Sequence, residues 1–476
     1  MIAARLAGSF RDPSGHLFRH AGRIYRQVNA SYREDYDRLM ASGFYAAAAR
    51  DGSLLPHEEV ELVLPIDSSD ARSQSADRGA APYKILLPEQ LPFVSYPYEW
   101  SFSQLKDAAL LTLRIQKTAL DFGLSLKDAS AFNVQFLRGR PVFIDTLSLE
   151  RHPENRPWVA YRQFCSHFLA PLALMAYRDP ECLRWLRVEL DGMPLDLASR
   201  LLPWRTRCRI GLLIHLHWHA RSQRVHADRK DSAEIAMRGG LSKAGLVGIL
   251  ESLENCIRHL DWQPRKTEWS DYYAETNYSS AAESHKLELV DAFLDAMRRP
   301  RSVWDLGGNT GRYGRLAARR GIPTISFDRD HAAIEESYRR IRAEGETSML
   351  PLVMDLSNPT PAIGWGNEER MSLIERGPAD VVMALALVHH LAIGNNVPLA
   401  RIAAYLRSLC KTLILEFVPK SDSQVQRLLR TRDDIFPNYH AAGFEEAFAP
   451  YFSIRRRETI RESERVLYWL EASGGN

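Results

Sequence analysis

Strand-like and helix-like segments alternate along residues 302–418, and this order restricts the chain to few folds. Strands that are joined through helices run parallel, so the pattern predicts a parallel sheet with helices on both faces. In open sheets of this kind the ligand lies at the carboxyl ends of the strands, where the strand order reverses. The expected strands are residues 302–307, 323–328, 349–355, 379–387 and 411–418.

The first expected strand ends in VWDLGGNTGRYG, residues 303–314, where a carboxylate precedes a glycine-rich turn. Glycines let the backbone approach a ligand closely, and amides at a helix start favour polar or anionic groups. The pattern is D-x-G-G-N-x-G, whereas a dinucleotide-binding turn has G-x-G-x-x-G. Asp305 would oppose a pyrophosphate but attract an amine, so we expect a nucleoside that carries an amino acid.

With these residues, the segment from about 270 to 470 resembles a class I S-adenosylmethionine-dependent methyltransferase. The resemblance implies a Rossmann-like, seven-stranded α/β sheet that ends in an antiparallel hairpin. The alternative is a nicotinamide-binding sheet. The first motif of the family matches Asp305, Gly307, Gly308, Asn309 and Gly311, which the resemblance assigns to the methionine part of the cofactor.

The resemblance assigns two further carboxylates to the cofactor, S-adenosyl-L-methionine. Asp328, which ends the second expected strand, would accept hydrogen bonds from both ribose hydroxyls. Asp355, which ends the third, would accept one from the adenine amino group, while Leu356 offers its backbone amide. The preceding segment resembles the cofactor-covering segment of some methyltransferases, and its candidate covering residues are Tyr273, Asn277, Tyr278 and Lys286.

Methyl transfer is an in-line displacement, so the protein must align the reacting atoms, exclude water and, for some acceptors, remove a proton. His389 and His390, directly after the fourth expected strand, are candidate bases because imidazole titrates near neutral pH. Alternatively, at least one of them caps or packs the following segment. Glu416, at the end of the fifth strand, is the alternative base or a substrate anchor.

The fourth strand ends in Ala-Leu-Ala-Leu, residues 384–387. Many amide and nucleobase amine methylases have Asn-Pro-Pro-Tyr at the corresponding place. Its absence favours an oxygen or carbon acceptor on a small molecule.

A second resemblance concerns residues 124–148, which look like the catalytic loop and metal-binding strand of protein-kinase-like folds. Asp128, Asn133 and Asp145 match the positions of a base and two magnesium ligands there. The alternation around Ala-Gly at residues 15–29 predicts a hairpin, which would belong to the small lobe, and residues 92–100 (PFVSYPYEW) predict a buried strand that forms the hinge. Arg26 stands about where a lysine is expected, and no glycine-rich loop is evident. We therefore expect an α+β, mostly helical and degenerate kinase-like domain. The alternative is an unrelated helical domain in which these carboxylates cap loops.

At 476 residues the chain is too long to fold around a single hydrophobic core. We expect an N-terminal domain at residues 1–222, a linker with a connecting helix at 223–268, and the methyltransferase domain at 269–476. The oligomeric state is left open.

Composition limits the partners and the compartment. A net charge of +3 is too small for a dominant nucleic-acid-binding field, so no nucleic-acid partner is expected. No apolar run is long enough to cross a bilayer, so no membrane partner is expected either. The five cysteines contain no CxxC pair, which fits a reducing cytoplasm. No metal site is expected, because His215, His217 and His219 lack the HExxH pattern and are better core or interface residues.

The leading hypothesis is a cytoplasmic methyltransferase for a small molecule, whose N-terminal domain helps to hold the acceptor. The whole arrangement also resembles bacterial methyltransferases related to a rhizobial nodulation protein. Two alternatives remain: a kinase-like phosphotransferase or bifunctional enzyme, and a non-catalytic module that binds S-adenosylmethionine.

Overall fold

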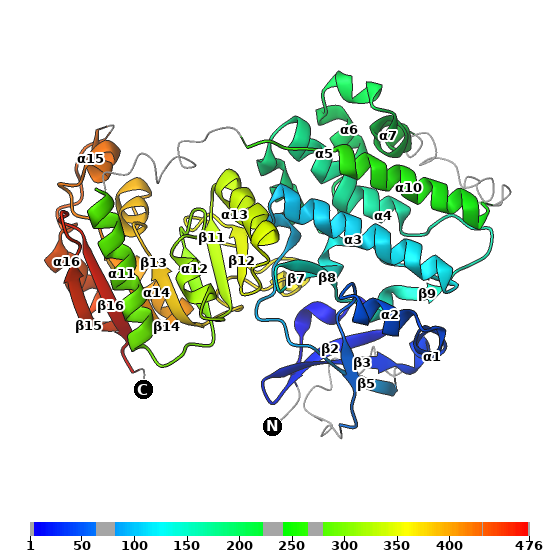
Figure 1. The fold of residues 1–476 in the computed structure, drawn as a ribbon, viewed down its shortest axis with the longest axis horizontal. Helices are drawn as coiled ribbons and strands as arrows, with labels where there is room; N and C mark the ends of the chain where they lie inside the picture. The colour runs from blue at the N-terminus through cyan, green and yellow to red at the C-terminus, as the bar shows by residue number, and fades with distance from the viewer. Residues whose placement is uncertain (1–3, 63–80, 222–240, 265–278, 431, 475–476) are drawn as a thin grey trace.

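The computed structural model describes residues 4–62, 81–221, 241–264, 279–430 and 432–474. An N-terminal half with a small sheet and many helices lies beside a C-terminal half that is built on a larger sheet (Figure 1). Among the described residues, no helix is long and apolar enough to cross a membrane.

The C-terminal sheet has seven strands in the order β12-β11-β10-β13-β14-β16-β15. The first five are parallel, and β16 and β15 complete the sheet as an antiparallel hairpin. The predicted α/β sheet with its final hairpin is therefore confirmed, and the strand order reverses between β10 and β13. The strands are β10 (Val303–Leu306), β11 (Thr324–Asp328), β12 (Met349–Val353), β13 (Ala379–Ala384), β14 (Cys410–Phe417), β15 (Phe452–Thr459) and β16 (Val466–Ala472).

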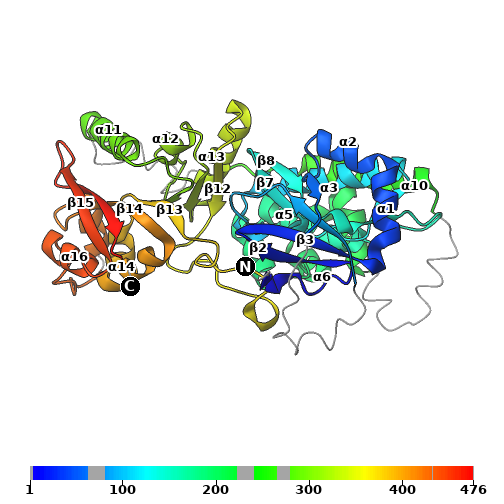
Figure 2. The same cartoon turned by 90° about the horizontal axis from the view of Figure 1, so that it is seen from below.

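Helices cover both faces of this sheet because successive strand residues point to opposite sides and are apolar on both. Val303 and Met383 pack with α11 and α12 on one face, while Val382 and Ala384 pack with α14 on the other. Figure 2 shows α11 and α12 on one side and α14 and α16 on the other. The helices are α11 (Ser280–Ala296), α12 (Gly314–Ala318), α13 (His331–Glu344), α14 (Leu399–Leu409), α15 (Ser423–Leu429) and α16 (Ala441–Phe448).

The N-terminal half begins with an antiparallel sheet in the order β1-β2-β3-β5-β4. The predicted hairpin at residues 15–29 is confirmed, and its turn has φ of 48° at Ala21 and 79° at Gly22. Helices and two short strand pairs, β6 with β9 and β7 with β8, make up the rest. The strands are β1 (Ala4–Arg5), β2 (Gly15–His20), β3 (Arg23–Asn29), β4 (His57–Glu59), β5 (Pro82–Pro88), β6 (Leu124–Leu126), β7 (Val134–Leu137), β8 (Arg140–Phe143) and β9 (Leu149–Arg151). The main helices are α1 (Arg33–Ser42), α2 (Phe44–Arg50), α3 (Phe102–Asp121), α4 (Tyr161–Phe164), α5 (Ala170–Tyr177), α6 (Leu195–Leu201), α7 (Ile210–Leu212) and α10 (Lys243–His259).

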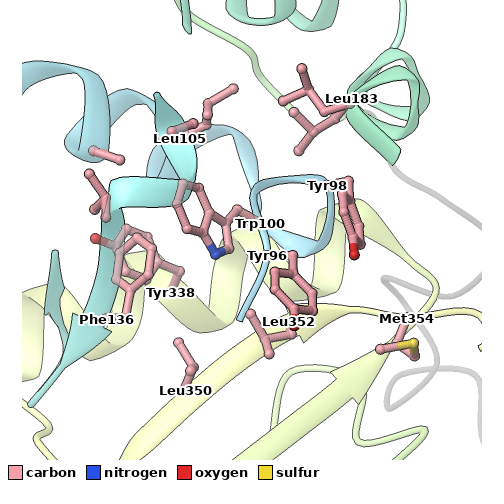
Figure 3. Packing of buried hydrophobic residues seen from close by; sticks show 14 of the residues in the cluster. Tyr96, Tyr98, Trp100, Leu105, Phe136, Leu183, Tyr338, Leu350, Leu352 and Met354 are labelled. Carbon is pink, nitrogen blue, oxygen red and sulfur yellow. The ribbon is translucent and has the colours of Figure 1, made fainter. Parts of the chain in front are cut away.

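Residues 93–105 connect the hydrophobic core of the N-terminal half with the C-terminal sheet, against which they pack. The ring of Phe93 packs edge-on against Trp304 and Phe327, with centroid distances of 5.5 and 5.8 Å. The buried strand predicted at residues 92–100 is wrong, because among the described residues this segment pairs with no strand and contains only the short 3₁₀ turn η3 (Pro97–Glu99). Figure 3 shows Tyr96, Tyr98, Trp100 and Leu105 beside Leu350, Leu352 and Met354.

Polar contacts also join the halves. Glu99 and Arg376 form an ion pair of 2.7 Å in which each side chain is only 1% exposed. Glu335 accepts a hydrogen bond of 2.9 Å from the amide of Ser103, at the start of α3. Breaking a buried, paired charge is costly, so these contacts hold the halves in one arrangement. The connecting helix α10 packs along α3 of the N-terminal half.

Candidate functional site

The glycine turn between β10 and α12 is packed too tightly for larger residues. A Cβ atom on Gly308 would lie 2.3 Å from Oγ of Ser326, and one on Gly311 would lie 2.0 Å from Cε of Met349. Gly311 also has a φ of +81°, which residues with a Cβ rarely adopt. The turn therefore rests directly on β11 and β12, at the predicted edge of the sheet.

Asp305 is 1% exposed and lies beneath this turn. Its Oδ2 accepts a hydrogen bond of 3.0 Å from the amide of Gly314. Burial raises the pKa of Asp305 to about 7, although the nearby ammonium of Lys286 favours the charged form. The carboxylate thus braces the turn from below, and its expected salt bridge with a ligand ammonium stays a prediction.

Asp328, at the end of β11, links the second strand to the same turn. Its Oδ2 accepts from the amide of Asn309 at 2.8 Å and its Oδ1 from the amide of Asp330 at 2.9 Å. Burial raises the pKa of Asp328 to about 6. Each carboxylate oxygen has a second lone pair, so Asp328 retains capacity to accept bonds from two hydroxyls.

Asp355 follows β12 and is held by the next turn. Its Oδ1 accepts from the amide and the hydroxyl of Ser357, at 2.9 and 2.6 Å. Partial burial raises the pKa of Asp355, but the hydrogen bonds from Ser357 outweigh it and leave the pKa below its ordinary value. This carboxylate is therefore ionised at neutral pH and acts as an acceptor.

A cavity of about 160 Å³ opens at the carboxyl ends of β10, β12 and β13, beneath α14. A dry cavity of about 150 Å³ holds a benzene ring, so this one has room for a planar ring system. Leu356, one of the predicted residues, is among its walls. The other lining residues are Leu306, Ser357, Pro359, Leu387, Leu391, Val397, Arg401, Ile402, Tyr405 and Leu406.

A chain of buried charges borders the turn on the side of β14. Nζ of Lys286, on α11, lies 2.6 Å from Oε2 of Glu416 and 4.5 Å from the centroid of the Tyr313 ring. Arg465 contacts Oε1 of Glu416 at 3.2 Å and also pairs with Asp422 at 2.7 Å. Both carboxylate oxygens of Glu416 are paired with cations, so Glu416 holds this wall together, and its role as a base stays a prediction.

His389 and His390 lie where the sequence places them, directly after β13. His389 is fully buried, and within the described part of the chain neither of its ring nitrogens has a hydrogen-bond partner. Burial lowers the pKa of His389 well below its ordinary value and that of His390 to about 4. Both rings are therefore neutral at pH 7, which is the form that a base requires, but their low pKa values make them weak bases.

Sequence reasoning missed the cavity wall from α14 and the ion pair of Lys286. The ion pair of Lys286 could have been inferred from the sequence, because Lys286 lies four residues from both Ala282 and Val290 on the buried stripe of α11. A charge on such a stripe requires a buried partner. Tyr278 lies outside the described residues.

The N-terminal half brings Asp128, Asn133 and Asp145 close together. Arg26 pairs with Asp145 at 2.7 Å and with Asp12 at 2.8 Å. Burial raises the pKa of Asp128, and the nearby Asp145 adds to this, while the side chain of Asn133 donates to Asp128 and opposes it. Within the described ranges, no group of His, Cys, Asp or Glu is arranged to hold a metal ion.

Two of the three histidines expected to be core or interface residues, His215 and His217, are buried. Tyr161 and Ser252 bond the two ring nitrogens of His215, each at 2.8 Å. Ser199 and Thr206 bond those of His217, at 2.8 and 2.9 Å. These hydrogen bonds explain why two imidazoles can be buried in this part of the fold.

No protein-family model matches the chain. The chain is 36% identical over 473 residues to the nodulation protein NoeA of Rhizobium meliloti (strain 1021), which covers 98% of this chain and 96% of that protein. Among solved structures, it is similar to a magnesium protoporphyrin IX methyltransferase from Synechocystis PCC 6803 with bound SAH, at 18% identity and a TM-score of 0.32, covering 43% of this chain and 93% of that one. It is also similar to the bifunctional kinase-methyltransferase WbdD, at 14% identity and a TM-score of 0.31, covering 42% and 41%.

Proposed function

This chain belongs to the family of the nodulation protein NoeA, and we propose that it is an S-adenosylmethionine-dependent methyltransferase. One observation carries the proposal: a close-packed glycine turn, a carboxylate bonded to that turn and an apolar cavity follow one another along the carboxyl ends of β10, β11 and β12. An adenosyl amino acid has three parts of matching chemistry in the same order, namely an amino acid, a ribose and a base.

The residues fit these parts by their chemistry. The glycine turn at residues 307–311 lets the amino-acid part approach the backbone closely, and Asp328 accepts from the ribose hydroxyls. The cavity beside Leu356 and Leu387 takes the flat base, with Asp355 at its rim as the acceptor for an amino group. Asp305 acts through the turn, which it supports by its bond to Gly314.

The cofactor, when bound, supplies a methyl group that its sulfonium has already activated. The chain therefore has to position the acceptor and keep water out. Lys286 and Glu416 form a buried, rigid wall beside the turn. His389 presents a neutral, buried ring with two polar nitrogens at the end of β13, which suits a hydrogen bond to the acceptor.

The acceptor is a small molecule with a reactive oxygen or carbon. The support is that the strand end at residues 384–387 is Ala-Leu-Ala-Leu and offers no side-chain amide to orient an amine. The charges beside the turn are paired, so this wall does not favour a strongly charged acceptor.

For the N-terminal half we propose a degenerate kinase-like domain that serves as a scaffold. Its five-stranded antiparallel sheet carries α1 and α2 between β3 and β4, and Arg26 lies opposite Asp145, as in a kinase-like arrangement. Arg26, at the place where phosphates would bind, is already paired with Asp145 and Asp12. Active phosphotransfer is the alternative function.

Calorimetric titration of the full-length protein with S-adenosylhomocysteine, and separately with ATP and magnesium, tests these proposals. We expect binding of the first ligand only. Binding of ATP alone would favour a phosphotransferase over a methyltransferase. Incubation with labelled cofactor and fractionated lysate then distinguishes an enzyme, which labels a component, from a module that binds the cofactor without transfer.

A further inference from the structure

One surface of the N-terminal half combines exposed apolar side chains with arginines. It is formed by residues 200–221, which run from the end of α6 through the 3₁₀ turn η8 (Trp204–Cys208) and α7 to the π-helix η9 (Leu213–Trp218). In Figure 1, α6 and α7 lie together at the end of this half that is away from β2, β3 and β5. We call this surface the Trp-Arg face, and its residues are Arg200, Leu201, Trp204, Arg205, Arg207, Arg209, Ile210, Ile214, Trp218 and Arg221.

The apolar members are unusually exposed for their size. Trp204 is 78% exposed, Ile210 is 74% and Trp218 is 56%. Single exposed apolar residues are common, but a group of large ones in a short segment marks an interaction site. Apart from Cys208, every exposed residue between positions 200 and 221 is apolar or arginine.

The helix geometry explains how these side chains share a face. Ile210, Ile214 and Trp218 are spaced four residues apart, close to one helical turn, and so form one stripe. The opposite side of the same helix is already occupied: Leu212 and Leu216 are buried, and Gly211 packs against Cys256 of α10. The exposed stripe is therefore additional to the face that the fold requires.

The charge of the face is of one sign. Residues 200–221 contain five arginines and no aspartate or glutamate, in a chain whose net charge is only +3. Arg200 is paired with Asp196 at 3.3 Å, while Arg205 follows the exposed Trp204 in η8 and Arg209 directly precedes the exposed Ile210. The matching partner is anionic and also takes up aliphatic side chains.

We propose that the Trp-Arg face binds reversibly to the surface of an anionic phospholipid bilayer. Arginines there contact lipid phosphates, while tryptophan and isoleucine side chains enter the boundary between headgroups and acyl chains. A nucleic acid offers phosphates but no place for Ile210 and Ile214. The lack of an apolar run long enough to span a bilayer predicted no membrane partner, but surface binding requires no span.

Co-sedimentation of the full-length protein with vesicles tests the proposal. We expect binding to phosphatidylcholine vesicles that contain phosphatidylglycerol, weaker binding at high salt, and little binding to phosphatidylcholine alone. The triple variant R205Q/R207Q/R209Q should weaken binding by about fivefold for each arginine removed. The double variant W204S/W218S should also lose binding, even at low salt.

Matched controls are available on the C-terminal half. Trp365→Ser removes a tryptophan that is 75% exposed, and R298Q/R299Q removes two exposed arginines. Both should bind vesicles like the unaltered protein, and all variants should keep its melting temperature.

Three results would overturn the proposal. The first is no difference between the face variants and the controls. The second is binding to single-stranded RNA, lost in R205Q/R207Q/R209Q, without binding to anionic vesicles. The third is a dimer in sedimentation experiments that W204S/W218S dissociates, again without vesicle binding, which would make the face a contact between two copies of the chain.

Discussion

Lys286 of α11 and Glu416 of β14 form an ion pair of 2.6 Å inside the C-terminal half, where neither side chain is more than 4% exposed. The pair connects the helix that precedes the sheet to the strand beside the glycine turn. Burial lowers the pKa of Lys286, and Glu416 opposes this by favouring the charged form. The wall beside the proposed methyl-transfer site thus depends on two residues far apart in the sequence.

Replacing Lys286 by Met should destabilise the fold by about 3–5 kcal/mol, because it leaves a buried carboxylate with one cation fewer. Urea unfolding measures this free energy. Lys411→Met is the matched control: its pair with Asp380 has a 57% exposed lysine, so the loss should stay below about 1 kcal/mol. Equal losses in both variants would contradict a special role for the buried pair.

Asp305 should make stability depend on pH. Burial raises its pKa to about 7 in the folded chain, whereas an unfolded Asp titrates near 3.9. Between these two pKa values the folded state therefore binds more protons than the unfolded state. Asp305 thus stabilises the fold below about pH 4, and this stabilisation, up to about 4 kcal/mol, is lost as the pH rises to about 7.

Asp305→Asn keeps an oxygen acceptor for Gly314 but removes this titration. Between about pH 4.5 and 7.5, where Asp305 titrates, the free energy of unfolding of this variant should fall less than that of the unaltered protein. Parallel curves for the two proteins would show that Asp305 does not titrate there.

Asp328→Ala should reduce the affinity for S-adenosylhomocysteine by about 100-fold, since the carboxylate both holds the turn through Asn309 and accepts from the ribose. The affinity of Asp328→Asn should lie between that of the unaltered protein and that of Asp328→Ala. Asp380→Asn serves as the control, because Asp380 lies at the opposite end of the sheet and bonds Arg301 and Lys411. Calorimetry gives the affinities, and equal losses for Asp328→Ala and Asp380→Asn would refute the assignment.

Leu356→Trp should fill the cavity of about 160 Å³ and weaken binding of S-adenosylhomocysteine by more than about tenfold. The melting temperature should change little, because the new ring occupies existing space. Ile374→Trp, at a position outside the cavity lining, should leave the affinity unchanged. Retained affinity in Leu356→Trp would mean that the base binds elsewhere.

His389→Leu should be as stable as the unaltered protein or more stable, by about 1–2 kcal/mol, because it removes two buried polar atoms without partners. Methyl transfer to the labelled lysate component should nevertheless fall by about 100-fold if the ring positions the acceptor. A large loss of stability would show that the ring has a structural partner in solution.

Local sequence determined the order and the ends of the C-terminal strands. Apolar runs such as that before Asp305 carry enough information to place a buried strand, and glycine at positions 308 and 311 marks where no Cβ fits. Carboxylates at strand ends, such as Asp328 and Asp355, follow from the same pattern, since parallel strands end at one edge.

Residues 93–105 show where local sequence was insufficient. Their apolar content predicted a buried strand, yet the segment is buried because Phe93 and its neighbours cover a sheet face formed more than two hundred residues later. Among the described residues, the connection between β12 and β13 contains no α-helix, only the short turn η10 (Trp365–Asn367). Periodicity reports that a side chain is buried, but it does not report against what.

The sequence by itself therefore determined which residues gather at the carboxyl edge of the sheet, because strand order and side-chain alternation are local properties. Only the tertiary structure decided that Asp305 faces its own turn, that Glu416 is held by Lys286 and Arg465, and that the halves share one core. Those outcomes depend on contacts between distant segments, where desolvation makes each buried charge take whichever partner the fold brings within reach.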